Sequence, residues 1–388
     1  MTFETQKLDV IIVGAGLGGL ACAVACGQQG LKTIILEKAE TISAVGAGIQ
    51  VPPNATRVMD SFGLLEKMAL KATTLEQLDV RRYADGALLA SKPLGEHCLR
   101  SLGYPWMVIH REDYHAILLE AALAHGADLR LGQQVSKVDV ELNQIYLSDG
   151  TIFTGDVIVG ADGFDVIPLG LWSYVRQSIY GRAMDPQETG DLAYRGTFSK
   201  EELLGLHNPR VADLCSRKSV TVWLGPDKHA VFYPVRSGQE FNMVLGYTVL
   251  LGDACHPTLP YQAQGAALAV EDGAVLGWLL GETSKRLTQE AELNASDRIQ
   301  GVLKLYESLR KVRTTTNVQG AIANRMMYHL PDGPDQVKRD KELLDFDYDH
   351  GRSDIKWADT EYQKDMLGFD AIGDAKQAFG KWWNSREA

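Results

Sequence analysis

The chain has 388 residues, of which 39 are Lys or Arg and 50 are Asp or Glu, so its formal net charge is −11 at pH 7. So acidic a chain repels phosphate backbones, and we do not expect it to bind nucleic acid. A hydrophobic content of 45% with 23% charged residues excludes a disordered chain, and the length predicts several domains or one α/β unit with an inserted subdomain.

The cysteines and the apolar segments indicate the cellular compartment in which the protein is found. Five cysteines, odd in number and scattered, favour a reducing compartment without a disulfide framework, and we expect a cytoplasmic location. Cys22 and Cys26 are interpreted as buried apolar groups rather than a metal or redox pair, and no metal site is predicted. No apolar stretch reaches the roughly 18 residues of a membrane-spanning helix.

The first predicted elements are typical of a dinucleotide-binding unit. A β-branched run at Leu8–Val13 predicts a buried parallel strand, and the Ala-rich segment Leu20–Gln29 predicts a helix. Between them lies Gly14-Ala15-Gly16-Leu17-Gly18-Gly19, a G-x-G-x-x-G pattern. A second strand, Lys32–Leu36, ends at Glu37.

Each position in this unit has a physical reason. Gly14 permits the tight turn, Gly16 lets backbone N–H groups approach a pyrophosphate, and Gly19 permits close contact between helix and strand. Glu37 stands where an acid accepts hydrogen bonds from a ribose diol. The pattern predicts a dinucleotide site but does not distinguish FAD from NAD.

Further along the chain, segments with the helical hydrophobic period alternate with segments that have the period of a strand. A Gly-rich loop at 45–54 precedes one predicted helix at 55–68, and residues 185–247 read as a β-rich region. The remaining predicted elements are a helix at 113–125, a meander of strands at 135–140, 144–147 and 151–153 turning at Asp149-Gly150, strands at 157–159 and 248–251, a helix at 264–280 closed by Gly281, and a long helix at 299–328.

Three motifs in this order resemble the single-component, FAD-dependent aromatic hydroxylases, in particular the fungal salicylate-hydroxylase-like monooxygenases. They are the N-terminal glycine pattern, Gly160-Ala161-Asp162-Gly163, and Gly252-Asp253-Ala254-Cys255-His256-Pro257 with the following Tyr261-Gln262-Ala263-Gln264-Gly265-Ala266. The likeness extends to residues 46–54, the Arg111 region and 194–198, and so covers most of residues 8–330.

The resemblance implies an α/β fold: a Rossmann-like FAD-binding domain with an inserted, here shortened, β-sheet substrate domain and a helical C-terminal region. We expect the FAD-binding domain to be assembled from residues 1–75, 108–184 and 248–330. The substrate domain would comprise residues 76–107 and 185–247, and residues 331–388 would form a helical tail.

The resemblance also implies roles for single residues. Glu37 would bind the adenosine ribose, Gln50 with Gly48 would lie beside the flavin, and Arg111 would lie near the pyrophosphate and ribityl chain. Asp253 would hold a ribityl hydroxyl and Ala266 would lie by the isoalloxazine. The candidate cofactor-binding residues are thus Gly14, Gly16, Gly19, Glu37, Gln50, Arg111, Asp253 and Ala266.

For catalysis, the resemblance points to Arg195, whose guanidinium would hold a phenolate, carboxylate or carbonyl group of the substrate. Tyr233 either faces the same pocket or is a core aromatic residue. Asp162 would contact both the FAD pyrophosphate and the nicotinamide cofactor, with a plain turn acid as the alternative. His256 is interpreted as packing against the cofactor rather than as a general base.

The sequence departs from the family pattern at two places. Residues 164–172 separate Gly163 from Ser173, where the family has two residues, so an insertion lies beside the cofactor. In addition, Asn242–Leu245 runs almost directly into Gly246–Leu251. Relatives have roughly fifty to sixty residues there, and their loss would leave sheet edges and apolar surface uncovered.

The leading hypothesis is an FAD-dependent monooxygenase that uses NADH or NADPH and O₂ to hydroxylate a small aromatic or phenolic substrate, plausibly in secondary metabolism. The alternatives are a flavin-binding protein with lost or impaired oxygenase activity, and a flavoprotein reductase or oxidase. The sequence leaves the substrate, the choice of NADH or NADPH and the oligomeric state open.

Overall fold

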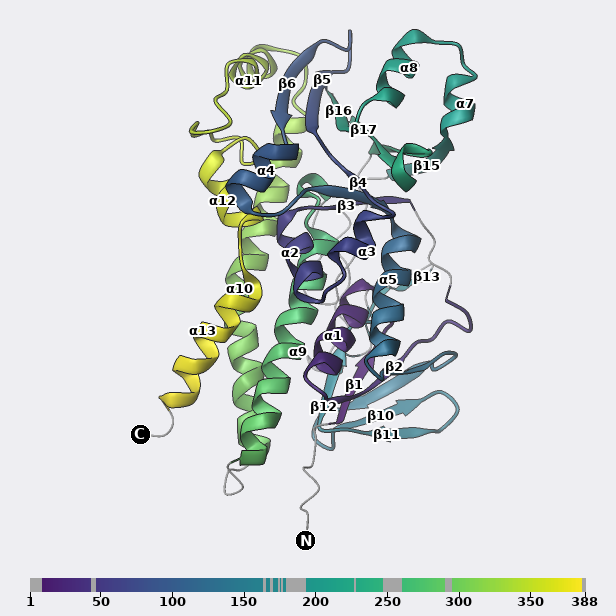
Figure 1. Cartoon of the computed structure of the whole chain (residues 1–388), viewed down its shortest axis with the longest axis vertical. Helices are drawn as coiled ribbons and strands as arrows, with labels where there is room; N and C mark the ends of the chain where they lie inside the picture. The colour runs from purple at the N-terminus through teal and green to yellow at the C-terminus, as the bar shows by residue number, and fades with distance from the viewer. Residues whose placement is uncertain are drawn as a thin grey trace.

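The structure, a computed structural model, describes residues 9–42, 47–162, 165–167, 170–173, 175, 177–178, 193–226, 228–246, 260–289 and 295–385. The molecule is elongated, with two sheets at its lower end, a large sheet at its upper end and long helices along one side (Figure 1).

A four-stranded parallel sheet forms the lower part, in the order β12-β1-β2-β8. Strand β1 (Asp9–Val13) lies between β12 (Val157–Gly160) and β2 (Lys32–Leu36), and β8 (Asp128–Arg130) is the far edge. The β-branched strand β1 is buried, as its composition predicts. Helix α1 (Leu17–Gln28) connects β1 to β2, which gives the predicted Rossmann-like unit.

Helix α1 packs on α9 (Gly265–Gln289) through small residues on both helices. A Cβ atom on Gly273 would lie 2.6 Å from the Cys22 nitrogen, and one on Gly277 would lie 2.4 Å from Ala25 Cβ. Only glycines allow backbones this close. The predicted end of α9 at Gly281 was wrong: the helix continues through it to Gln289, because Gly281 packs against Gln29 and does not cap the helix.

The C-terminal region is helical, as expected, and it is integrated into the fold. Helix α10 (Ala295–Tyr328) and α13 (Ala371–Asn384) run beside α9 (Figure 1). Trp383 of α13 is fully buried, and the guanidinium carbon of Arg298 lies 4.7 Å from the centre of its ring. Two more helices, α11 (Pro334–Leu344) and α12 (Thr360–Leu367), precede α13.

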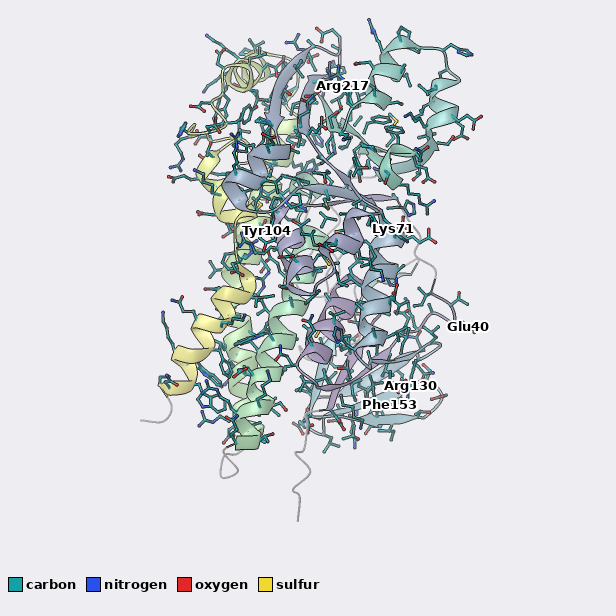
Figure 2. All side chains as sticks on the ribbon, viewed as in Figure 1. Glu40, Lys71, Tyr104, Arg130, Phe153 and Arg217 are labelled. Atoms are coloured by element: carbon teal, nitrogen blue, oxygen red, sulfur yellow. The ribbon has the colours of Figure 1, made fainter. Side chains whose placement is uncertain are left out.

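The predicted meander is confirmed. It consists of β9 (Val135–Asp139), β10 (Gln144–Leu147) and β11 (Ile152–Thr154), all antiparallel. Arg130 of β8 lies over the Phe153 ring of β11, 5.1 Å from its centre, and this contact joins the meander to the parallel sheet (Figure 2).

The upper sheet is six-stranded and draws on two distant parts of the chain. Its order is β15-β18-β17-β16-β5-β6, antiparallel except for the parallel pair β16 and β5. The strands are β5 (Gln77–Arg82), β6 (Leu88–Pro93), β15 (Ala193–Ser199), β16 (Ser219–Gly225), β17 (Lys228–Val235) and β18 (Glu240–Gly246). Two short helices, α7 (Lys200–Leu204) and α8 (Pro209–Ser216), pack on one face of this sheet in a hydrophobic cluster with Phe232 and Phe241.

Between the two ends lies a small sheet of β3 (Gly48–Val51), β4 (Thr73–Thr74) and β7 (Met107–His110), with α5 (Arg111–Ala124) following β7 and α4 (Gly95–Leu102) preceding it. The single helix predicted for residues 55–68 was wrong. The chain forms α2 (Pro53–Ser61) and α3 (Leu65–Ala69), because Gly63 adopts a positive φ of 72° between them.

The segment predicted as an insertion contains a hairpin, β13 (Asp165–Ile167) with β14 (Gly170–Trp172). No helix in the described part of the chain is long and apolar enough to cross a membrane.

Candidate functional site

The glycine loop is shaped by close contacts at two positions and open at a third. Gly14 has φ of 105°, and a Cβ there would lie 2.3 Å from the Ala161 carbonyl oxygen. A Cβ on Gly19 would lie 2.2 Å from the Gly14 carbonyl oxygen. At Gly16, the N-cap of α1, no atom of the described residues other than its chain neighbours lies within 4 Å of the place of a Cβ. The space at Gly16 is therefore open in front of the positive end of α1, where an anionic group is stabilised.

Glu37 holds this loop from the end of β2. Its carboxylate oxygens accept hydrogen bonds from the Ala15 N–H at 2.8 Å and the Ala39 N–H at 3.0 Å. A residue outside the predicted set, His115 of α5, reaches the same loop, with Nε2 2.7 Å from the Ala15 carbonyl oxygen. His115 falls on the inner side of an amphipathic helix, and that pattern alone does not single it out.

Asp162 follows β12 beside the glycine loop. Its Oδ1 accepts a hydrogen bond from the Ser173 hydroxyl at 2.7 Å, and its Oδ2 accepts one from the Val175 N–H at 3.3 Å. The carboxylate thus fixes the chain that returns from the β13–β14 hairpin. Its predicted contact with two cofactors stays a prediction.

Gln50 and Arg111 come from the small sheet and its edge. Gln50 pairs with Val108 of β7, and its buried Oε1 has no hydrogen-bond partner in the part of the chain that the structure describes. Arg111 begins α5 with an exposed side chain, and its N–H donates to the Ala47 carbonyl at 3.1 Å. An orphaned buried acceptor such as Gln50 Oε1 is the place where a bound group with a donor fits.

Helix α9 brings the third motif to the same place. A Cβ on Gly18 would lie 3.1 Å from the carbonyl oxygen of Ala269, the fifth residue of α9, so the first turn of α1 contacts the N-terminal part of α9. Ala266 is the second residue of α9 and packs on the core cluster around α1. Just before α9, Ala263 adopts φ of 55°, which is strained for a residue with a Cβ. Asp253 and His256 lie outside the described residues.

A buried charge network connects the segments on either side of this place. Glu271 of α9 is fully buried and accepts hydrogen bonds from Arg310 Nη2 at 2.7 Å, Arg313 Nη2 at 2.7 Å and Asn54 Nδ2 at 2.8 Å. Asn54 Nδ2 also donates to Gln264 Oε1 at 3.0 Å. The network therefore fixes the start of α2, which follows the Gln50 strand, to the residue before α9.

The ionisation of Glu271 follows from its neighbours. Burial opposes its charge, but Arg313 and Arg310, with their hydrogen bonds and that of Asn54, outweigh it and hold the pKa of Glu271 below its ordinary value. Arg310 also pairs with Asp272 at 2.6 Å. The only sign of this network in the sequence is the acidic pair Glu271-Asp272 within an apolar helix.

An apolar pocket of about 70 Å³ opens beside Gln50 and Ala263. Its walls come from the upper sheet, the segment before α9 and the C-terminal region. The lining residues are Gln50, Leu78, Lys92, Trp106, Val220, Val222, His229, Val231, Tyr261, Gln262, Ala263, Tyr328, Trp357, Gln363, Met366 and Leu367. A pocket with apolar walls and few polar groups is the usual form of a small-molecule site.

The two predicted catalytic residues differ in how much the structure says about them. Tyr233 is buried, and its ring packs on the backbone of β3: a Cβ on Gly48 would lie 2.5 Å from Tyr233 Cε2. It does not line the pocket. Arg195 lies on β15, in register with Val244, which is in turn in register with the pocket residue Val231. The Arg195 side chain lies outside the described residues.

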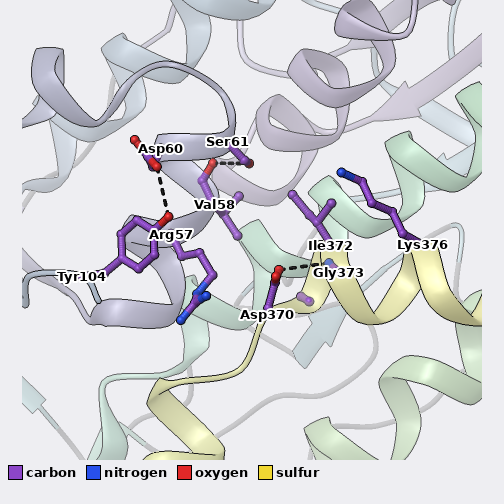
Figure 3. A pocket seen from close by; sticks show the side chains of 10 residues that line it. Arg57, Val58, Asp60, Ser61, Tyr104, Asp370, Ile372, Gly373 and Lys376 are labelled. Carbon is purple, nitrogen blue, oxygen red and sulfur yellow. Dashed lines mark hydrogen bonds between the residues drawn. The ribbon is translucent and has the colours of Figure 1, made fainter. Parts of the chain in front are cut away.

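A second and larger cavity, about 210 Å³, lies between α2 and the start of α13 (Figure 3). None of its lining residues belongs to the glycine loop or to the Gln50 and Ala263 segments. Within this cavity the Tyr104 hydroxyl donates to Asp60 at 3.0 Å and the Gly373 N–H donates to Asp370 at 2.9 Å. We therefore place the site at the smaller pocket.

Comparison with known proteins gives a family for this arrangement. The sequence profile described as "FAD binding domain" matches residues 7–240 and 232–304. The chain is 33% identical to the FAD-dependent monooxygenase OpS4 of Beauveria bassiana (strain ARSEF 2860), with 96% of this chain and 97% of the relative covered. It is 30% identical to a 3-amino-4-hydroxybenzoate 2-monooxygenase of Streptomyces cremeus, with 87% and 92% covered.

Solved structures support the fold. A salicylate hydroxylase in a substrate complex superposes with a TM-score of 0.72 at 18% identity, covering 96% of this chain and 98% of that one. The alignment with the Beauveria relative runs over 439 positions but takes in only 96% of the 388 residues of this chain, about 372, so that relative contains about 67 positions without a counterpart here.

Proposed function

This chain belongs to the family of FAD-dependent aromatic monooxygenases, and from that premise we propose that it hydroxylates a small aromatic or phenolic substrate with electrons from NADH or NADPH. The observation that carries the proposal is the open space at Gly16 in front of α1, a helix that contacts the N-terminal part of α9. The apolar pocket opens beside the segment before α9.

The residues present fit FAD. The space at Gly16 is open where a pyrophosphate would approach, and the orphaned Gln50 Oε1 offers an acceptor to the flavin side. When bound, FAD supplies the electron transfer and the oxygen activation that hydroxylation needs. We propose that Gly14, Gly16 and Gly19 shape the pyrophosphate site, and that Glu37 binds the ribose.

On the flavin side, we propose that Gln50, Arg111, Asp253 and Ala266 hold the cofactor. The N-terminal end of α9, where Ala266 lies, would stabilise negative charge on the flavin. The Asn54–Gln264–Glu271 network keeps the Gln50 strand and the start of α9 at a fixed separation. The apolar pocket walls exclude water from the substrate ring.

For the substrate, we propose that Arg195 holds an oxygen of the aromatic ring or its substituent. Support comes from its register with Val244 and, through it, with the pocket residue Val231. Tyr233 would act by supporting Gly48 and the strand that carries Gln50, since its ring packs on that backbone.

The domain division that follows from this proposal assigns residues 1–75, 108–184 and 248–330 to FAD and residues 76–107 and 185–247 to the substrate. The sharing of one sheet by residues 77–93 and 193–246 supports it. We also propose a cytoplasmic location, supported by the four described cysteines, all free and buried, and a role in secondary metabolism, supported by the fungal relative.

A second candidate is a flavin-binding protein without oxygenase activity. One observation favours it: the Beauveria relative has about 67 positions with no counterpart in this chain. Both candidates require bound flavin, so they differ only in whether an aromatic substrate is converted.

The experiment is to purify the chain, record its flavin absorbance, and follow NADH and NADPH oxidation with 3-amino-4-hydroxybenzoate and related phenols. Hydroxylated product in step with cofactor oxidation supports the monooxygenase. Bound flavin with no product from any aromatic compound supports the second candidate. Arg195→Ala is expected to abolish product formation and leave FAD bound, while Arg210→Ala, on the exposed helix α8, changes neither.

A further inference from the structure

Lys92 is a buried cation that no part of the proposed mechanism uses. It lies on the edge strand β6, and its side chain enters the apolar pocket. Lys92 is 7% exposed, and its Nζ donates one hydrogen bond, to Gln363 Oε1 at 3.2 Å. Among the described residues, no carboxylate lies within ion-pair distance of it. An ammonium group has three N–H donors, so Lys92 has donors available for a ligand.

The same pocket contains further donors without acceptors. The indole Nε1 atoms of Trp106 and Trp357 are buried and have no hydrogen-bond partner in the part of the chain that the structure describes. Both tryptophans line the pocket with Lys92. A buried donor without an acceptor costs free energy, and a buried charge without a counter-charge costs more. These groups together call for a ligand that brings acceptor oxygens and negative charge.

The pocket walls indicate the chemical character of the remaining, uncharged part of the ligand. Leu78, Val220 and Val222 of the sheet line the cavity together with Met366 and Leu367 of the C-terminal region. Gln50 and Ala263 bring the pocket to the segments that we propose to hold the flavin. A flat apolar body with one anionic end matches this lining.

We propose that Lys92 binds the carboxylate of an aromatic acid, with Gln363 positioning the ammonium group, and that this chain therefore takes aromatic acids in preference to uncharged phenols. The inference rests on the proposed function for the place of the ring beside the flavin. Gln363 is itself held, since its Nε2 donates to the Lys356 carbonyl at 3.3 Å.

The charge state of Lys92 agrees with this role. Burial lowers the pKa of Lys92 to about 8, while Cys98 beside it acts in the opposite direction. The group is therefore mostly protonated at neutral pH, and a bound carboxylate stabilises the charge further.

The test compares an anion with its uncharged analogue by equilibrium binding to the flavin-loaded chain, without NADH or NADPH. Dissociation constants are measured for 3-hydroxybenzoate and 3-hydroxybenzamide with the wild type, Lys92→Met and Lys364→Met. Lys364 is exposed and follows Gln363 on α12, so it is the matched control. We expect the wild type and the control to prefer the anion by about tenfold to a hundredfold.

Lys92→Met is expected to lose this preference and to bind the benzamide as well as the wild type does. Its melting temperature without ligand stays the same or rises, because an apolar side chain replaces an unpaired buried charge. A merely structural Lys92 would predict a fall. The proposal is overturned if Lys92→Met keeps the preference, or if the wild type has none, a comparison that needs no variant. Because no turnover is involved, a chain that binds the anion but forms no product refutes the proposed function alone.

Discussion

Removal of the Glu271 charge tests the network that holds the two sides of the cofactor site together. Glu271→Gln keeps the shape of the side chain but replaces one acceptor oxygen by a donor. Arg310 and Arg313 each reach the carboxylate at 2.7 Å, and the residue is 0% exposed. Donors would then face donors in a site that excludes water.

The magnitude follows from this burial. Breaking a buried ion pair by removing one partner costs about 3–5 kcal/mol. Arg310 keeps Asp272 as a partner and Arg313 keeps the Met366 carbonyl, so we expect a value at the lower end of that range. Glu307→Gln on α10 is the control: its ion pair with Lys311 is exposed, and its loss costs about 0–1 kcal/mol.

The assay is urea unfolding of both variants and the wild type at several pH values. Because the folded state lowers the pKa of Glu271, its contribution is present above the unfolded-state pKa and is lost as the pH falls through the folded-state value. The wild-type advantage over Glu271→Gln should therefore shrink in acid. A loss below about 1 kcal/mol at neutral pH, or an advantage that does not depend on pH, would refute the reasoning.

Three further predictions concern the loop, the C-terminal helix and the pocket. Gly16→Ala should fold normally but bind FAD more weakly, since a Cβ there meets no atom of the described residues beyond its chain neighbours. Gly14→Ala should fail to fold stably because of its positive φ. Flavin titration and melting curves would separate the two variants, and equal behaviour would contradict both expectations. Trp383→Ala should cost about 3–5 kcal/mol in urea unfolding, and a change under about 1 kcal/mol would show that α13 does not anchor the fold. The affinity for 3-hydroxybenzoate should fall as the pH rises above about 8, where Lys92 loses its charge, while that for 3-hydroxybenzamide stays level; parallel curves would exclude Lys92 as the cause. Among the described residues, the other titratable side chains around Lys92 are His97, Cys98, His229, Tyr261 and Tyr328.

The sequence predicted the elements whose causes are local. The strand, glycine turn, helix and acid of residues 9–37 follow from neighbours in the chain, and so do the meander turning at Asp149-Gly150 and the long helix α10. Each of these depends on periodicity or turn chemistry within a few residues.

The sequence did not predict the features that depend on contacts between residues far apart in the chain. Gly281 looks like a helix end, but its contact with Gln29 makes it an interior packing position. Nothing local predicts that β5 pairs in parallel with β16, because more than a hundred residues with several helices and strands lie between them. The sequence around Lys92 gives no sign that this lysine is buried, because the sheet and the C-terminal region bury it only together.

The most direct test of the central claim is whether this chain inserts oxygen from O₂ into an aromatic ring. The flavin-loaded protein would be given NADPH or NADH, an aromatic acid and isotopically labelled O₂, and the product examined by mass spectrometry. We expect a hydroxylated product that carries one labelled oxygen atom for each nicotinamide oxidised. Oxidation of the nicotinamide with hydrogen peroxide as the only product, for every aromatic acid offered, would contradict it.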